Sequence, residues 1–394
     1  MADELFHKID PDGDVVLILH NPNAPFAVWN GNEEIERLAL SALKESGNAG
    51  SGSTTTGLSH NESLSLIQQW EGLTPEAQPV EPVDEPVDEP KIKYLVSSRH
   101  LSLASNYFQA KFKGPWMEAS TKHADGRYHV DASDWDSRAL LTLMQAMHGR
   151  HRAIPRQVTL EMLAKMAVLV DYYDCLEVIE IFSSMWIESL KNKLLNGLPT
   201  QYGRDMVLWL LISHVFQQDD VFSQMTKIAV TQSKEPVLTM ELPIPSIVTD
   251  LIEWQRQDAI EFIVKTLQDL LGTLRKGLSG CDFECSSILL GALTKNMDEH
   301  KLLDPAPKEP YTGHSIVGME SLVNGFRCPQ WRCSQWQHSE DYDSGYPRSC
   351  DLTTMISTRL KTQPQAAKEG FKLSEIQALT QKRSLKAEAT EKIG

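Results

Sequence analysis

The sequence predicts an α+β fold, in which helices cover a small sheet, followed by an all-α C-terminal extension. Two apolar runs, DVVLIL at 14–19 and IKYLV at 92–96, have the length and aliphatic content of strands. From Leu101 onwards, apolar residues recur at spacings of three and four, which is the period of an amphipathic helix. A few strands followed by a run of helices is typical of an α+β domain.

The N-terminal strand is bounded by Gly13 and by the turn sequence HNPNAP. We expect FAVW at 26–29 to be the short strand that returns. Residues 31–90 then lose this pattern and contain a Gly/Ser/Thr tract and the acidic repeat EPVDEPVDEP. Residues 71–90 carry seven acidic residues and no Lys or Arg. Because proline removes backbone donors and like charges repel, we expect a disordered insertion within the domain.

Order is expected to resume with the strand at 92–96 and one helix that buries an apolar face and ends before Gly114 and Pro115. The residues of that face are Leu101, Ala104, Phe108 and Phe112. GRYHVDA is a further predicted strand, and Ser133 to Asp136 has the form of a capping box ahead of the helix WDSRALLTLMQAMHG. Two more helices are predicted, VTLEMLAKMAVLVDYY and LEVIEIFSSMWIESLKNKL.

Four motifs occur together in this region: an aspartate-led strand GDVVLIL, the helix entry VSSRHLSLASNYF, the turn HGR…IP and the helix end LVDYYDC. In this order the chain resembles a BTB/POZ domain of the divergent type abundant in fungi. The resemblance covers residues 12–191. It implies a protein-interaction platform without catalysis, in which the strand and helix residues build the core.

Known partners of such domains are further copies of the domain, cullin scaffolds and transcriptional regulators, so the resemblance implies protein partners of these kinds. The sequence departs from the family in two respects. It lacks the extended N-terminal helix and strand that some relatives exchange between subunits. The helix LLTLMQAMHG lacks the hydrophobic-x-Glu pattern of cullin-binding adaptors.

Beyond residue 192 the pattern predicts a helical extension. One helix face joins Val207, Leu210, Leu211 and Val215, and another joins Ile252, Ile260, Ile263 and Leu267. The predicted organisation is a flexible N-terminus over 1–11, a BTB/POZ-like domain over 12–191 with the insertion at 31–90, a helical extension over 192–325, and a mostly disordered tail over 326–394 with one helix near LSEIQALTQKRSLKAEA.

Composition narrows the class of protein. The chain has 394 residues, a net charge of −15 and six cysteines. Its Lys and Arg residues are scattered, which argues against a nucleic-acid partner. It has no secretory signal pattern and no apolar run long enough for a membrane span, so we expect an intracellular protein of the nucleus or cytoplasm with no membrane partner. Its cysteines are expected to be free thiols.

A metal site is one reading of the C-terminal Cys and His residues. Tetrahedral zinc takes four thiolate or imidazole ligands, and the chain offers a Cys-x3-Cys and a Cys-x4-Cys pair. The competing reading is a set of free thiols, which the sequence favours, so no cofactor is predicted. The candidate ligands are Cys281, Cys285, Cys328, Cys333, His338 and Cys350.

A partner contact is the second candidate site. Trp331 and Trp336 lie close together with no core pattern around them, and exposed aromatic residues often mark contacts. We expect this segment to dock on the chain's own helical part or on a partner.

Two enzymatic readings are disfavoured. The tract at 47–54 has the glycine spacing of a phosphate-binding loop, but Ser53 stands where that loop needs lysine. Cys175, His148 and Asp171 could form a nucleophile, base and acid, but a buried thiol at a helix end is the simpler reading. The predicted function is thus a non-enzymatic interaction module. A cullin-type ubiquitin-ligase adaptor, self-association alone, and a zinc-dependent nucleic-acid-binding regulator remain alternatives.

Overall fold

The computed structural model of the chain describes residues 5–30, 90–113, 122–193, 197–331, 350–363 and 368–391. The chain divides into two units. A large unit holds residues 3–28 and 91–394, and a small unit holds residues 29–90. The predicted insertion at 31–90, including the tract at 47–54, lies outside the described residues except for Pro90.

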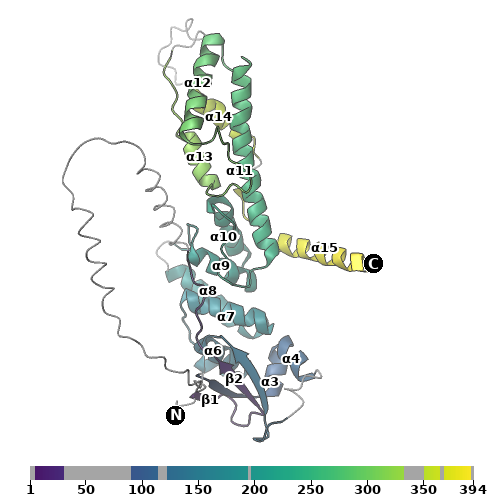
Figure 1. Cartoon of the computed structure of the whole chain (residues 1–394). Helices are drawn as coiled ribbons and strands as arrows, with labels where there is room; N and C mark the ends of the chain where they lie inside the picture. The colour runs from purple at the N-terminus through teal and green to yellow at the C-terminus, as the bar shows by residue number, and fades with distance from the viewer. Residues whose placement is uncertain are drawn as a thin grey trace, which may run out of the picture. The chain divides into compact units, whose positions relative to one another are not determined.

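A four-stranded sheet lies at the N-terminal end of the large unit (Figure 1). Its strand order is β1-β3-β2-β4, with β2 antiparallel to β3 and parallel to β4. The strands are β1 (Leu5–Lys8), β2 (Val15–His20), β3 (Ile92–Val96) and β4 (Tyr128–Ser133). Val15, Leu17 and Leu19 of β2 are fully buried, as expected for a central strand. The α+β class is confirmed.

The sheet differs from the sequence prediction at two places. Residues 5–8 were expected to be flexible, but they form β1, which pairs in parallel with β3. The predicted strand at 26–29 is wrong. Ala27 has a φ of 46°, outside the range of a strand, and Arg204 takes its carbonyl oxygen and that of Phe26 as hydrogen-bond acceptors. The strand that returns is β3.

In the described residues of this part of the chain, five helices form a helical layer, in which α6 contacts β3 and the others pack on one another (Figure 1). They are α3 (Ser98–Ala104), α4 (Asn106–Lys113), α6 (Ser137–Met147), α7 (Leu160–Tyr173) and α8 (Leu176–Lys193). The single helix expected after β3 is divided at Ser105, whose hydroxyl accepts from Phe108 N and donates to Tyr173 O. The cap of α6 is Asp136, not Ser133, because the Asp136 carboxylate accepts from Arg138 N and Ala139 N.

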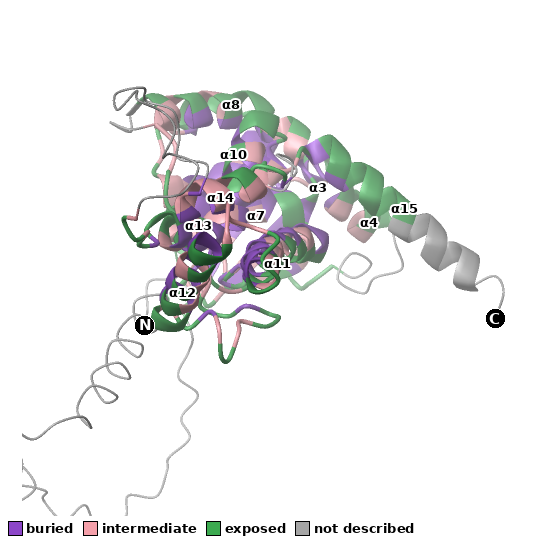
Figure 2. Ribbon diagram, turned by 90° about the horizontal axis from the view of Figure 1, so that it is seen from above, coloured by how far each residue is buried: buried purple, intermediate pink, exposed green. Residues whose placement is uncertain are grey.

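The predicted helical extension is present. It consists of α9 (Arg204–Val215), α10 (Asp219–Gln232), α11 (Ser246–Arg275), α12 (Phe283–Glu299) and α13 (Ile316–Asn324). Both predicted apolar faces, on α9 and on α11, are buried. Buried residues lie on α10, α11 and α13, which contact one another (Figure 2). In the described part of the chain, no helix combines the length and the apolar content needed to cross a bilayer.

The C-terminal segment is more ordered than the sequence suggested. α14 (Leu352–Leu360) and α15 (Leu373–Glu391) follow the helical extension. Leu352 and Ile356 are buried, and α14 packs against α11, α12 and α13. The tail therefore supplies core residues. The sequence did not reveal them, because a helix of nine residues is too short to show a clear apolar period. Residues 332–349 and 364–367 lie outside the described residues.

The pair of helices α3 and α4 is held by hydrogen bonds from three distant segments, and we call this set of bonds the α3–α4 clamp. The Asp14 carboxylate, at the start of β2, accepts from Ser98 N at 2.8 Å and from Ser98 Oγ at 2.7 Å. His148 Nε2, at the end of α6, accepts from Ser97 N at 2.9 Å. The third segment is the end of α7, where Ser105 Oγ donates to Tyr173 O.

A fourth contact completes the clamp at the same end of α7. Asn106 Nδ2 donates to Asp174 Oδ2 at 2.8 Å, and Asn106 N donates to Asp174 O at 3.3 Å. Gly13 permits the approach of Asp14, because a Cβ at this position would lie 2.6 Å from Val96 O. The four motifs of the sequence resemblance are thus joined physically at this helix pair.

Removal of the Asp14 carboxylate should destabilise the fold. The substitution Asp14→Ala leaves the N–H and hydroxyl of Ser98 without their acceptor, and we expect a loss of about 1–2 kcal/mol in the free energy of unfolding. Chemical denaturation of the full chain measures it. Asp12→Ala, which removes an exposed carboxylate from the same turn, is the control. Equal stability of the two variants would contradict the role of Asp14.

The clamp also makes stability depend on pH. His148 Nδ1 contacts Met144 O at 2.7 Å, so the ring must stay neutral for Nε2 to accept from Ser97. Burial lowers the pKa of His148 below its ordinary value of 6.5. As the pH falls through about 6.5, His148 binds a proton more readily in the unfolded chain than in the folded chain. The free energy of unfolding therefore falls as the pH falls. Burial lowers the pKa values of His7, His214 and His314 in the same direction.

We expect His148→Gln to be less stable at neutral pH and to lose less additional stability from about pH 7.5 to about pH 5.5. Thermal unfolding across this range measures both effects. His151→Gln, which changes an exposed ring on the same turn, should keep the wild-type dependence. An unchanged slope in His148→Gln would show that His148 does not carry the effect.

Candidate functional site

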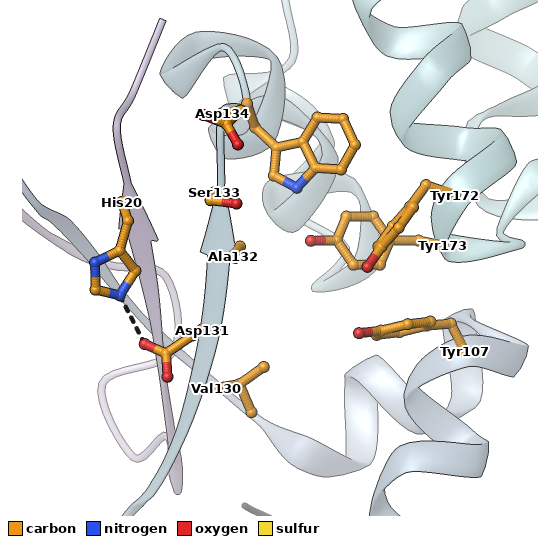
Figure 3. Close-up of a pocket in the computed structure, with 10 residues that line it drawn as sticks. His20, Tyr107, Val130, Asp131, Ala132, Ser133, Asp134, Tyr172 and Tyr173 are labelled. Atoms are coloured by element: carbon orange, nitrogen blue, oxygen red, sulfur yellow. Dashed lines mark hydrogen bonds and ion pairs between the residues drawn. The ribbon is translucent and has the colours of Figure 1, made fainter. Parts of the chain in front are cut away.

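A groove of about 430 Å³ lies beside strand β4, and we call it the aromatic groove (Figure 3). One wall is formed by consecutive residues of β4 and the turn after it. Figure 3 shows the other wall, which is made of tyrosine side chains that reach in from α4 and α7. The lining residues are His20, Tyr107, Val130, Asp131, Ala132, Ser133, Asp134, Trp135, Tyr172 and Tyr173.

The aromatic side chains of the groove pack on one another. The ring centroids of Tyr172 and Tyr173 are 4.9 Å apart, and those of Trp135 and Tyr172 are 5.2 Å apart. Tyr107 lies 5.3 Å from both tyrosines of α7. A hydrogen bond with Tyr107 raises the pKa of Tyr172 above its ordinary value. These contacts hold the rings in fixed positions, so the groove exists before any ligand binds.

The backbone of β4 offers unused hydrogen-bonding groups. Within the described residues β4 pairs only with β2, which makes it an edge strand. Tyr128 N donates to Asp14 O and Asp134 N donates to His20 O, both toward β2. Backbone groups alternate along a strand, so the N–H groups of Asp131 and Ser133 point to the outer edge. Such an edge can pair with another extended chain.

The rim of the groove carries carboxylates, and none of its lining residues is Lys or Arg. The Asp131 carboxylate lies 2.7 Å from His20 Nε2, as Figure 3 shows, and Asp134 accepts from Asn21 Nδ2 at 2.6 Å. Both aspartates are exposed. The site therefore combines aromatic faces, free backbone groups and a negatively charged rim.

The structure brings three of the predicted metal ligands together. The thiol sulfurs of Cys281, Cys285 and Cys350 all lie within 4.8 Å of one another. Cys328 is not part of this group, and its sulfur accepts from Leu352 N at 3.4 Å at the start of α14. The other two candidates, Cys333 and His338, lie outside the described residues.

Of the two tryptophans predicted to mark a partner contact, the structure describes only Trp331. Its side chain is partly buried, and its Nε1 is covered without a hydrogen-bond partner in the described part of the chain. Trp336 lies outside the described residues. The docking hypothesis for this segment stays a prediction.

The three residues considered as a catalytic set hold other positions. Burial raises the pKa of the Cys175 thiol to about 12, so this thiol stays protonated at neutral pH. His148 is engaged with Ser97 and Met144 in the clamp. Burial raises the pKa of Asp171, and the charged groups that act on it are His214 and Asp174, not His148. A thiol activated by a neighbouring base is therefore not formed by these residues.

The sequence analysis did not identify the residues of the aromatic groove. Tyr107, Trp135 and Tyr172 fall within segments that the sequence analysis assigns to helices, and it gives none of them a role in a site. One signal was available in DYYD at the end of α7. Consecutive residues of a helix point about 100° apart, so Tyr172 and Tyr173 cannot both face the same core. The structure buries Tyr173 and leaves Tyr172 51% exposed.

No protein-family model matches this chain, and no curated protein shows significant similarity to it. The sequence resemblance to BTB/POZ domains is therefore without support from these comparisons.

We expect the exposed rings of the groove to contribute little to stability. Tyr172→Ala should lower the free energy of unfolding by less than about 1 kcal/mol, because the ring remains half in water. Tyr173→Ala, which removes a ring that is 2% exposed, should cost about 3–5 kcal/mol. Chemical denaturation of both variants gives the comparison. Similar losses would mean that Tyr172 belongs to the core.

Proposed function

We propose that this chain is a non-catalytic protein-interaction module of the BTB/POZ kind, and that it binds an extended segment of a partner protein in the aromatic groove. The observation that carries the proposal is the coincidence of an unpaired strand edge with a preformed aromatic wall. Strand addition to a sheet edge gains affinity from main-chain hydrogen bonds and specificity from pockets that take alternate side chains.

The geometry of β4 supports this mode of binding. The outward N–H groups of Asp131 and Ser133 are two residues apart, which is the spacing at which an added strand forms its hydrogen bonds. The side chains of such a strand would meet Tyr107, Trp135 and Tyr172 alternately with solvent. Aromatic residues dominate the energy of many protein interfaces because they bury a large area at a small entropic cost.

The charge of the site indicates the chemistry of the partner. Asp131 and Asp134 are exposed at the rim, and Asp171 and Asp174 are exposed at the neighbouring end of α7. A segment with Lys or Arg among apolar residues would match this rim. Its cations could also lie over the tyrosine faces. We therefore propose a basic, apolar and extended partner segment.

The sequence resemblance supports the same class of function. Its four motifs meet at the α3–α4 clamp, so one structural unit explains why they occur in this order. The family it resembles acts through protein contacts. The clamp sets the position of α4, which carries Tyr107, relative to α7, which carries Tyr172.

The test is affinity purification of the tagged full chain from its native cells, with identification of the captured proteins by mass spectrometry. Two groove variants are compared with the wild type. Tyr107→Ala combined with Tyr172→Ala removes two rings of the groove wall, and Ser133→Pro removes an outward N–H group without changing the pairing with β2. We expect at least one partner of the wild type to be lost from both variants.

The control is Ile181→Ala, which removes a side chain that is 82% exposed on α8, outside the groove. Thermal unfolding confirms that each variant is folded. Full retention of every partner by both groove variants would refute the site. Loss of a cullin from the groove variants would make the chain a ubiquitin-ligase adaptor, whereas loss of only copies of the chain itself would make it a self-association module.

A further inference from the structure

We propose that Cys281, Cys285, Cys328 and Cys350 bind a zinc ion that fastens the C-terminal segment to the helical extension. These residues come from three segments of the chain. Cys281 precedes α12, Cys285 lies in its first turn, and Cys350 precedes α14. Figure 1 shows α14 beside α12 and α11, in agreement with the contacts of these helices.

The distances fit a tetrahedral thiolate site. A Zn–S bond of about 2.3 Å places the sulfurs of a tetrahedral site about 3.8 Å apart. The sulfurs of Cys281, Cys285 and Cys350 lie within 4.8 Å of one another. A shift of less than about 1 Å per pair would therefore complete the geometry. Free buried thiols are common, but they have no reason to converge from two distant segments.

Cys328 is in position to be the fourth ligand. Its sulfur lies outside the group of three but accepts from Leu352 N at 3.4 Å, so it lies at the first turn of α14, which Cys350 precedes. Its thiol also hydrogen-bonds to the Asp351 carboxylate. A rotation of the Cys328 side chain toward Cys350 would bring a fourth sulfur to the site. Four thiolates favour zinc over the hard cations, which prefer oxygen ligands.

The surrounding backbone is suited to thiolates. Cys285 lies in the first turn of α12 and Cys350 lies two residues before α14, and a helix N-terminus stabilises negative charge on sulfur. Asp282 caps α12 by accepting from Cys285 N at 2.7 Å, and Asp351 caps α14 by accepting from Thr354 N at 2.9 Å. These caps fix the backbone at three of the four cysteines.

The loop between α11 and α12 is shaped to place Cys281 over α12. Gly280 has a φ of 96°, and a Cβ at this position would lie 3.0 Å from Ser286 N. Arg359 of α14 donates to Ser279 Oγ at 3.3 Å, and Ser279 donates to Thr273 Oγ1 at 2.9 Å. Hydrogen bonds to α11 and to α14 therefore hold this loop in position.

The site would be structural and not catalytic. Cys285 and Cys350 are buried, and four protein ligands leave no coordination position for a substrate. Zinc would connect a helix of nine residues to the rest of the fold. Such a short helix gains little stability by itself, so a crosslink two residues before its start has a large effect on its docking.

The experiment starts from the full chain, purified without chelators, with metals measured by plasma mass spectrometry and thiols counted after denaturation. We expect about one zinc per chain and a lower unfolding temperature after chelation. The variants Cys281→Ser, Cys285→Ser, Cys328→Ser and Cys350→Ser should each lose most of the zinc. Cys333→Ser is the matched control, because it removes a cysteine from the same region that is not assigned to the site.

A second measurement does not depend on the variants folding. The chelated wild-type chain is refilled with cobalt, whose absorption spectrum reports the number of thiolate ligands and tetrahedral geometry. A spectrum of four thiolates supports the proposal. Absence of metal with all six thiols free, or loss of two thiols to a disulfide, would overturn it. Zinc that is retained in Cys328→Ser and lost in Cys333→Ser would overturn the assignment of the fourth ligand.

Discussion

The fold of the N-terminal part depends on how the helix pair α3–α4 is held. The first helix of the pair, α3, receives no capping bond from the Ser97 side chain, and the acceptor comes instead from Asp14, which precedes β2. The break at Ser105 is stabilised from the end of α7. Helices this short are marginal alone, and long-range hydrogen bonds fix their orientation. Because α4 and α7 carry the tyrosines of the aromatic groove, the same bonds position the site.

Much of this fold could be predicted from the sequence because its main elements are strongly periodic. The central strand at Val15 and the helices α7, α8, α9 and α11 are found where apolar spacing placed them. The failures have a common cause, which is that distant groups decide the local conformation. Arg204 holds Ala27 out of a strand, and α14 is ordered by its contacts with α11 and α12. Neither influence is visible in a short window of sequence.

The candidate sites divide in the same way. Zinc ligands are few in type, so the sequence could list the three thiols that the structure brings together among its six candidates. Two of these thiols, Cys281 and Cys285, form a pair that is close in sequence. The partnership with Cys350 required the docking of α14. The aromatic groove left a weaker signal, since an exposed tyrosine on a helix looks like a core tyrosine until the facing strand is known. The two proposed sites rest on different elements and are independent of each other.

The most direct test of this account is native-state hydrogen exchange of the wild-type chain, resolved at the amides of Ser97, Ser98, Asn106 and Phe108. The first amides of a helix normally exchange fast because they lack acceptors within the helix. The account predicts that these four amides exchange as slowly as the amides of the central strands. Three of them donate to distant residues of the clamp, and Phe108 N donates to the Ser105 hydroxyl that the clamp holds. Fast exchange at all four amides would contradict it, because the groove would then lack a fixed wall.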